Sequence, residues 1–481
     1  MIINIFRNHP LMVLFLIALV LRLLFSFYFQ QFYFGEFVFK YKDTPGYLNP
    51  ILNLINHGTY IGDIYLEDSK YFRVPVYPSF LGALYLLVGF EYLDYIVAIV
   101  QSIIDSLTVI LVYKIILKVT SIKRMAFLSA FIYATYPFVI LWSPIMYTEV
   151  IQIFLIFVLL YLVLMNHHEK KYTFIAGALV GILILTKQYL GLFLLVPLWV
   201  VFFSHTIPKI TKKILLISLV FIGMGTVVTP WAVRNYIESG KVIILKAEST
   251  GLRARGLDYE AFEKFANLFN ENITPMMNEI AYKGTLTFNQ HMKFVDNHKI
   301  VIDTLAKRAY TCGTSFMEIR IPSGKDIPHE GCDDEIVRGF ENLTQQFWNE
   351  VSFFTAMETR KDAVKKIFMK SDIVSQKIVF SKTKFFKTLL FKYRVILIFL
   401  GFLGYLFIYL QYVKIKEKTF VASLMLTAVS FYVYFSLVIV HVEMRYILVP
   451  DILISIFASI PMVFLIDNLK KIFKKEYIYE R

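Results

Sequence analysis

The chain has 481 residues, of which 57% are apolar, 17% aromatic and only 18% charged. Soluble globular domains carry about 25% charged residues, so this composition excludes an ordinary soluble protein and predicts residence in a membrane. The net charge of +14 comes from Lys and Arg in short clusters between apolar runs. That arrangement is typical of the positive-inside bias of polytopic membrane proteins and argues against nucleic-acid binding.

Apolar runs of spanning length, about 20 residues, recur along the chain. The first contains Arg22 and lacks a small-residue cleavage site, so we expect a retained span rather than a signal peptide. Another run, 77–90, is shorter and carries Pro78, which is more typical of an interfacial helix. Ten runs qualify as predicted spans, near residues 10–30, 95–117, 124–141, 147–165, 172–187, 189–204, 214–233, 394–413, 419–440 and 446–466.

The basic loops assign an orientation to these spans. Loops 118–124, 170–171, 209–213 and 414–418 and the tail 470–475 are all cytoplasmic only if 77–90 does not cross the membrane. We therefore predict a juxtamembrane helix at 77–90 and both termini in the cytoplasm. Segments 31–94, 142–146, 234–393 and 441–445 then lie outside the cytoplasm.

The predicted fold class is an all-α polytopic membrane protein. It has about ten transmembrane helices, juxtamembrane helices and a large, helical extracytoplasmic loop with helical patterning around 257–310 and 335–392. We predict three regions: an N-terminal transmembrane module (1–233, with its first outer loop at 31–94), a loop domain (234–393), and C-terminal transmembrane helices with a basic tail (394–481).

Ionisable residues gather on the outer side of this topology. They are Asp43, Arg73, Glu149, Lys187, Arg234, His441, Glu443 and Arg445. A transporter needs such groups along a path near the membrane midplane, whereas an enzyme that acts on a lipid headgroup needs them at one interface. The distribution favours a membrane enzyme over a permease.

Arg73 illustrates the chemistry that this face offers. Pro75 and Pro78 follow it and oppose continuation of a helix, so the guanidinium is displayed at the start of the juxtamembrane helix. A rigid guanidinium fork suits a phosphate. The alternative is an interfacial arginine whose side chain extends to lipid headgroups.

The polar residues also follow the order seen in a known family. The order is Asp43 with Tyr47 and His57-Gly58, Arg73-x-Pro-x-Tyr-Pro, Ser143-Pro144 with Glu149, Arg234-Asn-Tyr with Gly240, and His441-Val-Glu-Met-Arg-Tyr with Pro450. In this order and in its topology, the chain resembles the GT-C membrane glycosyltransferases of the protein O-mannosyltransferase and aminoarabinose transferase type, which use polyprenyl-phosphate-linked sugars. The resemblance covers residues 1 to about 255 and 394–455, and no motif is recognised in 256–393.

The resemblance implies roles for individual residues. It implies that Asp43 is the general base that accepts the proton of the acceptor, and that 1–233 is the catalytic module. A carboxylate within hydrogen-bond reach of a hydroxyl can perform this step. The alternative for Asp43 is an N-cap of the following helix, because Asp before Thr-Pro is a good cap.

The leaving group in such a reaction is a phosphate, which cations stabilise as negative charge develops. The resemblance implies that Arg73 and Arg445 contact this phosphate, with Lys187 and Arg234 as further candidates and His441 and Tyr47 on the donor side. Glu149 would line the cavity or orient the acceptor. The alternatives are a salt-bridged arginine at a helix end for Arg445 and a favourable helix-dipole contact for Glu149.

Two charges lie deeper in the predicted spans. Arg22 and Asp105 each lie on the order of 12 to 15 Å below the outer ends of their spans, at 1.5 Å per residue. Each alone would be costly in hydrocarbon, so we expect a structural buried pair. Cys312 and Cys332 lie in the same outer segment and form a possible disulfide.

The sequence therefore predicts a glycosyltransferase of the cell membrane, multi-pass, with its active site on the extracytoplasmic face. It would transfer a sugar from a polyprenyl-phosphate-linked donor to a glycan, lipid or protein acceptor. We expect no cofactor, no essential metal and no nucleic-acid partner. The alternatives are a lipid-linked oligosaccharide flippase or other multi-pass permease, and a catalytically inactive relative that acts as an assembly subunit.

Overall fold

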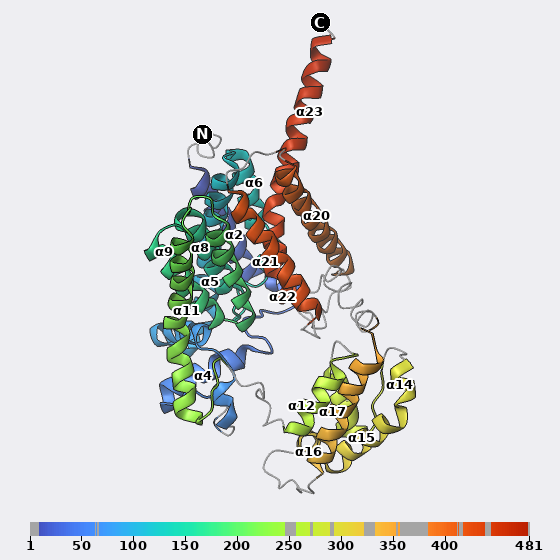
Figure 1. The fold of residues 1–481 in the computed structure, drawn as a ribbon. Coiled ribbons are helices and arrows are strands. Elements are labelled where there is room, and N and C mark those ends of the chain that lie inside the picture. The colour runs from blue at the N-terminus through green and yellow to red at the C-terminus, as the bar shows by residue number, and fades with distance from the viewer. Residues whose placement is uncertain are drawn as a thin grey trace.

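The computed structural model describes residues 9–62, 64, 67–245, 256–269, 273–288, 293–321, 332–352, 355, 383–410, 412, 417–437 and 444–479. Every regular element of these residues is a helix, which confirms the predicted all-α fold. The helices form a membrane part, built from both ends of the chain, and a smaller helical bundle from its middle (Figure 1).

The N-terminal helices of the membrane part follow the apolar runs. Their bounds are α2 Pro10–Leu24, the π-helical η1 Phe25–Phe29, α3 Gln30–Phe34, α4 Thr44–His57, η2 Glu67–Tyr71, α5 Val76–Thr120, α6 Lys123–Ala134, α7 Pro137–Ile140, α8 Glu149–Asn166, α9 Lys170–Ile184, η3 Gln188–Leu194, α10 Leu195–Phe203 and α11 Ile210–Ser239. The C-terminal helices are α20 Thr383–Tyr409, α21 Lys418–Leu437, α22 Met444–Ser455, η4 Ile456–Ala458 and α23 Ser459–Tyr479.

Seven helices in the described part of the chain are long and apolar enough to cross a membrane. They are Pro10–Phe34, Val76–Thr120, Glu149–Asn166, Ile210–Ser239, Thr388–Tyr409, Lys418–Phe435 and Met444–Lys470. The other three predicted spans coincide with shorter helices. The span at 124–141 is divided between α6 and α7 because Tyr136 is extended before Pro137, and the spans at 172–187 and 189–204 correspond to α9 and to η3 with α10.

The juxtamembrane helix predicted at 77–90 forms the first part of α5. Gly89 interrupts α5 with φ 74° and ψ 178°, a conformation that is open almost only to glycine. The chain therefore contains a short helix, a backbone break and then the longer helix that covers the predicted span 95–117. Proline at the start of the short helix is tolerated because the first helical N–H groups have no intrahelical acceptor.

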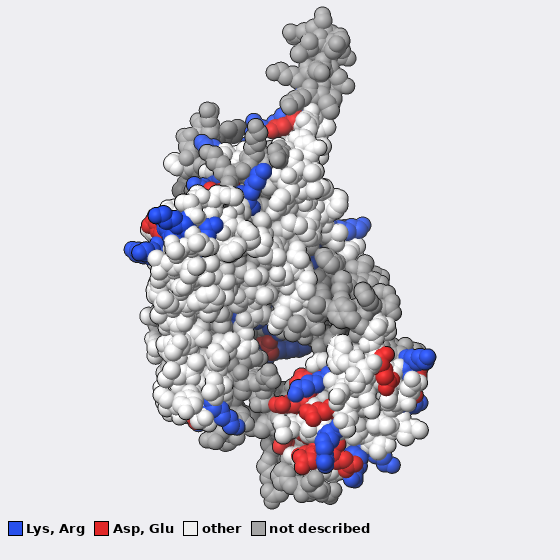
Figure 2. Space-filling model, viewed as in Figure 1, with Lys and Arg blue, Asp and Glu red and all other residues white. Residues whose placement is uncertain are grey.

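The C-terminal helices pack against the N-terminal ones around a common apolar core. The Ser129 hydroxyl of α6 donates to the Ile456 carbonyl oxygen of η4 at 2.6 Å. Figure 2 shows a broad belt of uncharged residues on this part of the molecule, with Lys and Arg gathered beyond it, toward the end where the N-terminus and α23 lie. This surface is typical of a protein embedded in a bilayer.

Two buried ion pairs join helices within the membrane part. Arg22 of α2 donates from Nε to Asp105 Oδ2 of α5 at 2.5 Å, and Tyr133 of α6 donates to the other carboxylate oxygen. The structure thus brings the two deep charges together. A second pair, Arg394 with Asp451, links α20 to α22 through Nε and Oδ2 at 2.5 Å and was not predicted from the sequence. Arg394 is the first residue of the predicted span 394–413 and Asp451 is the sixth of 446–466, so equal depth, which pointed to Arg22 and Asp105, did not point to this pair.

The middle of the chain forms a separate helical bundle with its own apolar core. Its helices are α12 Leu257–Ala266, α13 Ile273–Lys283, α14 Lys293–Asn297, α15 Lys299–Cys312, α16 Thr314–Arg320 and α17 Asp333–Glu350. Phenylalanines dominate this core; for example, the rings of Phe262 and Phe340 lie 5.5 Å apart. None of these described helices is among the candidate membrane spans, and their apolar side chains are buried against one another.

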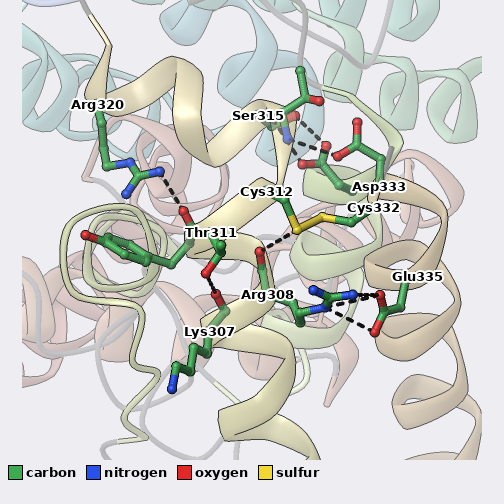
Figure 3. The surroundings of a disulfide bond; sticks show 12 residues. Lys307, Arg308, Thr311, Cys312, Ser315, Arg320, Cys332, Asp333 and Glu335 are labelled. Atoms are coloured by element: carbon green, nitrogen blue, oxygen red, sulfur yellow. Dashed lines mark hydrogen bonds and ion pairs between the residues drawn. A yellow bond between two sulfur atoms is a disulfide. The ribbon is translucent and has the colours of Figure 1, made fainter. Parts of the chain in front are cut away.

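A disulfide and three carboxylates hold the short helix α16 and the start of α17 in this bundle (Figure 3). Cys312 and Cys332 are bonded, with their Cα atoms 5.9 Å apart. Asp333 Oδ1 accepts the Thr314 backbone N–H at 2.9 Å. Asp258 accepts the Ser315 N–H at 3.1 Å and its hydroxyl at 2.5 Å. Arg308 donates from Nη2 to Glu335 Oε2 at 2.6 Å.

Candidate active site

The segment that carries Asp43 lies against the segment that precedes α8. The Met146 N–H donates to the Phe39 carbonyl oxygen at 2.9 Å, and the Tyr41 N–H donates to Thr44 Oγ1 at 2.8 Å. Asp43 then immediately precedes α4, in the N-cap position, but its side chain makes no capping hydrogen bond. Its carboxylate is therefore available for other partners.

Those partners are the two arginines that the resemblance assigned to phosphate. Arg445 donates from Nη1 to Asp43 Oδ2 at 2.8 Å, and Arg73 Nη2 lies 3.8 Å from Asp43 Oδ1. The carboxylate is 35% exposed, whereas the Arg445 side chain is only 9% exposed. Three residues, from the start of α4, the segment just before α5 and the start of α22, thus meet at one point.

A cavity of about 240 Å³ opens beside this cluster. It is lined mainly by aromatic side chains and two cations, which are contributed by Tyr47, Phe72, Arg73, Val74, Thr186, Lys187, Gln188, Tyr189, Tyr434 and Tyr446. The Arg73 guanidinium lies 4.3 Å from the ring centres of both Tyr47 and Phe72. Such stacking stabilises a cation that lies on the face of an aromatic ring, and it fixes the plane of the guanidinium.

Glu149 and the cavity-lining Lys187 form an ion pair. Lys187 Nζ donates to Glu149 Oε1 at 2.9 Å, and their side chains are 15% and 1% exposed for Lys187 and Glu149, respectively. Glu149 Oε2 is buried without a hydrogen-bond partner among the described residues, and so is Gln152 Nε2 one turn further along α8. Glu149 and Gln152 each accept a hydrogen bond from a residue that lines the cavity, from Lys187 and Tyr189 respectively. The unused acceptor and the unused donor therefore lie close to the cavity.

Arg234 takes a different position from the other predicted cations. Its guanidinium donates to the carbonyl oxygens of Lys70 and Tyr60, each at 3.1 Å, and it does not line the cavity. The Tyr60 hydroxyl in turn donates to the Arg73 carbonyl oxygen at 3.2 Å. Burial raises the pKa of Tyr60 well above its usual value, although Arg234 and Arg73 oppose this shift. Arg234 therefore contacts the backbone of the first loop, and His441 lies outside the described residues.

Several residues of the site were not identified from the sequence. Tyr147, Tyr189, Tyr434, Tyr446 and Phe72 all contact the predicted cations or line the cavity. Some signals were present: Tyr446 follows Arg445 directly, and Tyr147 lies two residues before Glu149. The chain holds 31 tyrosines, however, so residue type alone does not separate these from tyrosines that only fill the core.

Among the described residues, no group of three or more His, Cys, Asp or Glu side chains converges in a way that could hold a metal ion. The chemistry available in the cluster is that of one carboxylate, two guanidiniums and an aromatic wall.

Comparison with known proteins identifies one family model that matches part of the chain. No individual curated protein matches the chain. The family model described as dolichyl-phosphate-mannose-protein mannosyltransferase matches residues 70–233, which include Arg73, Glu149 and Lys187. This family is of the GT-C type, so the match confirms the resemblance to the GT-C membrane glycosyltransferases.

Proposed function

We propose that this protein transfers a sugar from a polyprenyl-phosphate-linked donor to an acceptor outside the cytoplasm. The observation that carries the proposal is the contact of Asp43 with Arg445 and Arg73 beside an aromatic cavity. A carboxylate next to two guanidiniums supplies both a base and a binding site for a phosphate leaving group. The family match supports a donor of the dolichyl-phosphate-mannose kind.

In the proposed reaction, an acceptor hydroxyl or amine attacks the anomeric carbon of the donor sugar. Asp43 accepts the proton of that nucleophile as the new bond to carbon forms. The bond between the anomeric carbon and the phosphate oxygen breaks, and the phosphate leaves with the electron pair. Arg73 and Arg445 stabilise the negative charge that develops there, as preorganised donors do in other transferases.

The remaining predicted residues have supporting roles in this proposal. Lys187 adds positive charge to the cavity wall, and Tyr47 holds the Arg73 guanidinium in place. Glu149 keeps the buried Lys187 charged through their ion pair. Arg234 supports the first loop through its bonds to the carbonyls of Tyr60 and Lys70.

The topology and the regions belong to the same proposal. We place both termini in the cytoplasm and the cavity on the opposite face of the cell membrane. The gathering of Lys and Arg toward the end of the membrane part with the N-terminus supports this orientation. Regions 1–233 and 394–481 would form the transmembrane catalytic unit, and the loop 234–393 would cover the active site and select a glycan, lipid or protein acceptor.

Replacement of Asp43 by asparagine tests the proposal. Asparagine keeps the size of the side chain but cannot accept a proton, so transfer should fall about 10²- to 10⁴-fold. The measurement is incorporation of labelled sugar from polyprenyl-phosphate mannose into acceptors in membranes that contain equal amounts of each variant. Binding of polyprenyl phosphate should be retained, because Arg73 and Arg445 remain.

Asp94→Asn is the matched control. Like Asp43, Asp94 has a carboxylate in an ion pair, with 2.7 Å between its Oδ1 and Lys40 Nζ, but it does not line the cavity. We expect this variant to transfer sugar at the wild-type rate. Unchanged transfer by Asp43→Asn would remove Asp43 from the mechanism, whereas movement of the lipid-linked sugar without transfer to an acceptor by the wild type would favour a permease.

A further inference from the structure

Tyr147 contacts both halves of the proposed catalytic machinery. Its hydroxyl oxygen accepts the backbone N–H of Asp43 at 3.0 Å. Its ring faces the Arg445 guanidinium at 5.2 Å. The side chain is 1% exposed, so these contacts are made in a water-excluded setting in which hydrogen bonds and cation–ring contacts are stronger.

The hydroxyl contact bears directly on the direction of the Asp43 carboxylate. The N–H of a residue that begins a helix has no acceptor within that helix. Here the Tyr147 hydroxyl supplies the acceptor, and the Asp43 side chain is not used for capping. Only two side-chain torsions connect the backbone of Asp43, which this hydrogen bond fixes, to the carboxylate. One carboxylate oxygen faces Arg73 and the other faces Arg445.

Tyr147 is itself held by neighbouring groups. Buried Gln101 of α5 donates from Nε2 to the carbonyl oxygens of Ser143 and Ile145, at 3.0 and 2.9 Å. Tyr77 donates to Gln101 Oε1 at 2.9 Å. The Tyr147 ring also packs against the Tyr47 ring, with centroids 5.8 Å apart. The segment 143–147 is therefore pinned to α5 by polar bonds that do not involve the cavity.

We propose that Tyr147 is a positioning residue, whose hydroxyl orients the Asp43 carboxylate and whose ring holds the Arg445 guanidinium. This inference rests on the proposed function, because it assigns Tyr147 a role through Asp43. Tyr147 does not exchange a proton with the substrate. It reduces the number of arrangements that the base and the phosphate-binding arginine can take before the donor and acceptor arrive.

Tyr147→Phe separates the two contacts. Phenylalanine keeps the ring under Arg445 but removes the acceptor for the Asp43 N–H. Because small misplacements of a catalytic group are costly, kcat should fall about ten- to a hundredfold, whereas KM for polyprenyl-phosphate mannose should stay near the wild-type value. Tyr147→Leu removes the ring as well and should raise that KM in addition.

Tyr136→Phe is the matched control for loss of a buried hydroxyl. Tyr136 is 1% exposed, and its hydroxyl has no hydrogen-bond partner among the described residues. We expect kcat and KM of this variant to match the wild type. If Tyr147→Phe folds poorly, a fluorotyrosine at position 147 weakens the hydroxyl as an acceptor and keeps the ring, and a smaller fall in kcat without a change in KM is expected.

A double-mutant cycle on kcat distinguishes a role of Tyr147 through Asp43 from a merely structural role. If Tyr147 acts through Asp43, Tyr147→Phe should cause little further loss in an Asp43→Asn background. Independent, multiplicative losses would overturn the inference, and so would wild-type kcat in Tyr147→Phe when Asp43→Asn is impaired. Wild-type transfer by Asp43→Asn would instead overturn the role of Asp43 as base in the proposed function, and this inference with it, whereas absence of transfer by the wild type would overturn the proposed function itself.

Discussion

At the scale of residues, a charge in this protein is informative only together with its partner. Asp43 occupies an N-cap position, yet its side chain does not cap α4 and contacts Arg445 and Arg73 instead. Glu149 stands in the first turn of α8, where the helix dipole favours it, and also pairs with Lys187. For Asp43 the structure therefore does not show the capping alternative, whereas for Glu149 the helix-dipole contact and the ion pair involve the same carboxylate, so substitution is needed to separate them.

The Glu149–Lys187 pair leads to a prediction about stability. Glu149→Gln leaves the Lys187 ammonium largely buried without its counter-ion, and breaking a buried pair in this way costs about 3 to 5 kcal/mol. The additional change Lys187→Gln should recover most of that loss. The measurement is the midpoint of thermal unfolding of the purified protein in detergent.

The exposed pair of Arg124 and Asp467 provides the comparison. These side chains are 69% and 44% exposed, with 2.7 Å between Arg124 Nη1 and Asp467 Oδ1. Exposed pairs contribute about 0 to 1 kcal/mol, so Asp467→Asn should leave the midpoint almost unchanged. Equal shifts for Glu149→Gln and Asp467→Asn would show that the first pair is not effectively buried.

At the scale of elements, the main uncertainty in the sequence was how 77–90 relates to the span that follows it. Apolar content continues through both, so hydropathy alone does not separate them. The break at Gly89 does, because it reorients the chain between two helical segments. The short segment places Tyr77 against the Tyr47 ring, at 5.4 Å between centroids, and so connects this break to the wall of the cavity.

Gly89→Ala should destabilise the protein for a backbone reason. A Cβ atom at this position would meet nothing within 4 Å, so crowding is not involved. The positive φ is unfavourable for alanine, and strain of this kind costs on the order of 1 to 3 kcal/mol. We expect a lower thermal midpoint and slower sugar transfer, measured on the same preparation.

Gly225→Ala is the control for this change. Gly225 lies inside α11, and a Cβ there also meets nothing within 4 Å, but its φ is not positive. Alanine in a helix interior is favoured over glycine by about 1 kcal/mol, so this variant should be as stable as the wild type or more so. A loss of stability in both variants would point to packing rather than to the backbone at Gly89.

At the scale of the whole molecule, the structure combines a membrane part with a helical bundle that has its own core and disulfide. The two parts face different solvents, so different terms stabilise them. In the bundle, burial raises the pKa of Asp258, and hydrogen bonds from Arg308 lower the pKa of Glu335. The two carboxyls therefore make the stability of the bundle depend on pH in opposite senses.

The directions of these shifts predict a stability maximum. A raised carboxyl pKa means that the contribution of Asp258 is complete below the ordinary value of about 4 and is lost as pH rises through its folded-state pKa. A lowered pKa means that the contribution of Glu335 is present above that ordinary value and is lost as pH falls through its folded-state pKa. Asp258→Asn should remove the first loss, and Glu335→Gln the second.

The measurement is hydrogen exchange of α12 and α17 in the full chain, corrected for the intrinsic effect of pH. It reports how the stability of the bundle falls with pH on each side of the maximum. The two variants serve as controls for each other, because each should change only one side of the profile. A profile of wild-type shape in Asp258→Asn would contradict the assignment of the high-pH slope to this buried carboxyl.

The sequence by itself determined the membrane class, the all-helical fold and the family resemblance, because bilayer length, charge clustering and motif order are properties of the linear chain. It also indicated the pairs Arg22 with Asp105 and Cys312 with Cys332, which the structure brings into contact. Only the tertiary structure decided that Asp43 meets Arg445, 402 positions later, that Arg234 bonds to backbone carbonyls outside the cavity, and that Tyr147 lies beneath the cluster. The physical reason is that such contacts depend on how helices pack and on which face of each helix is buried, and neither is encoded in the local spacing of residues.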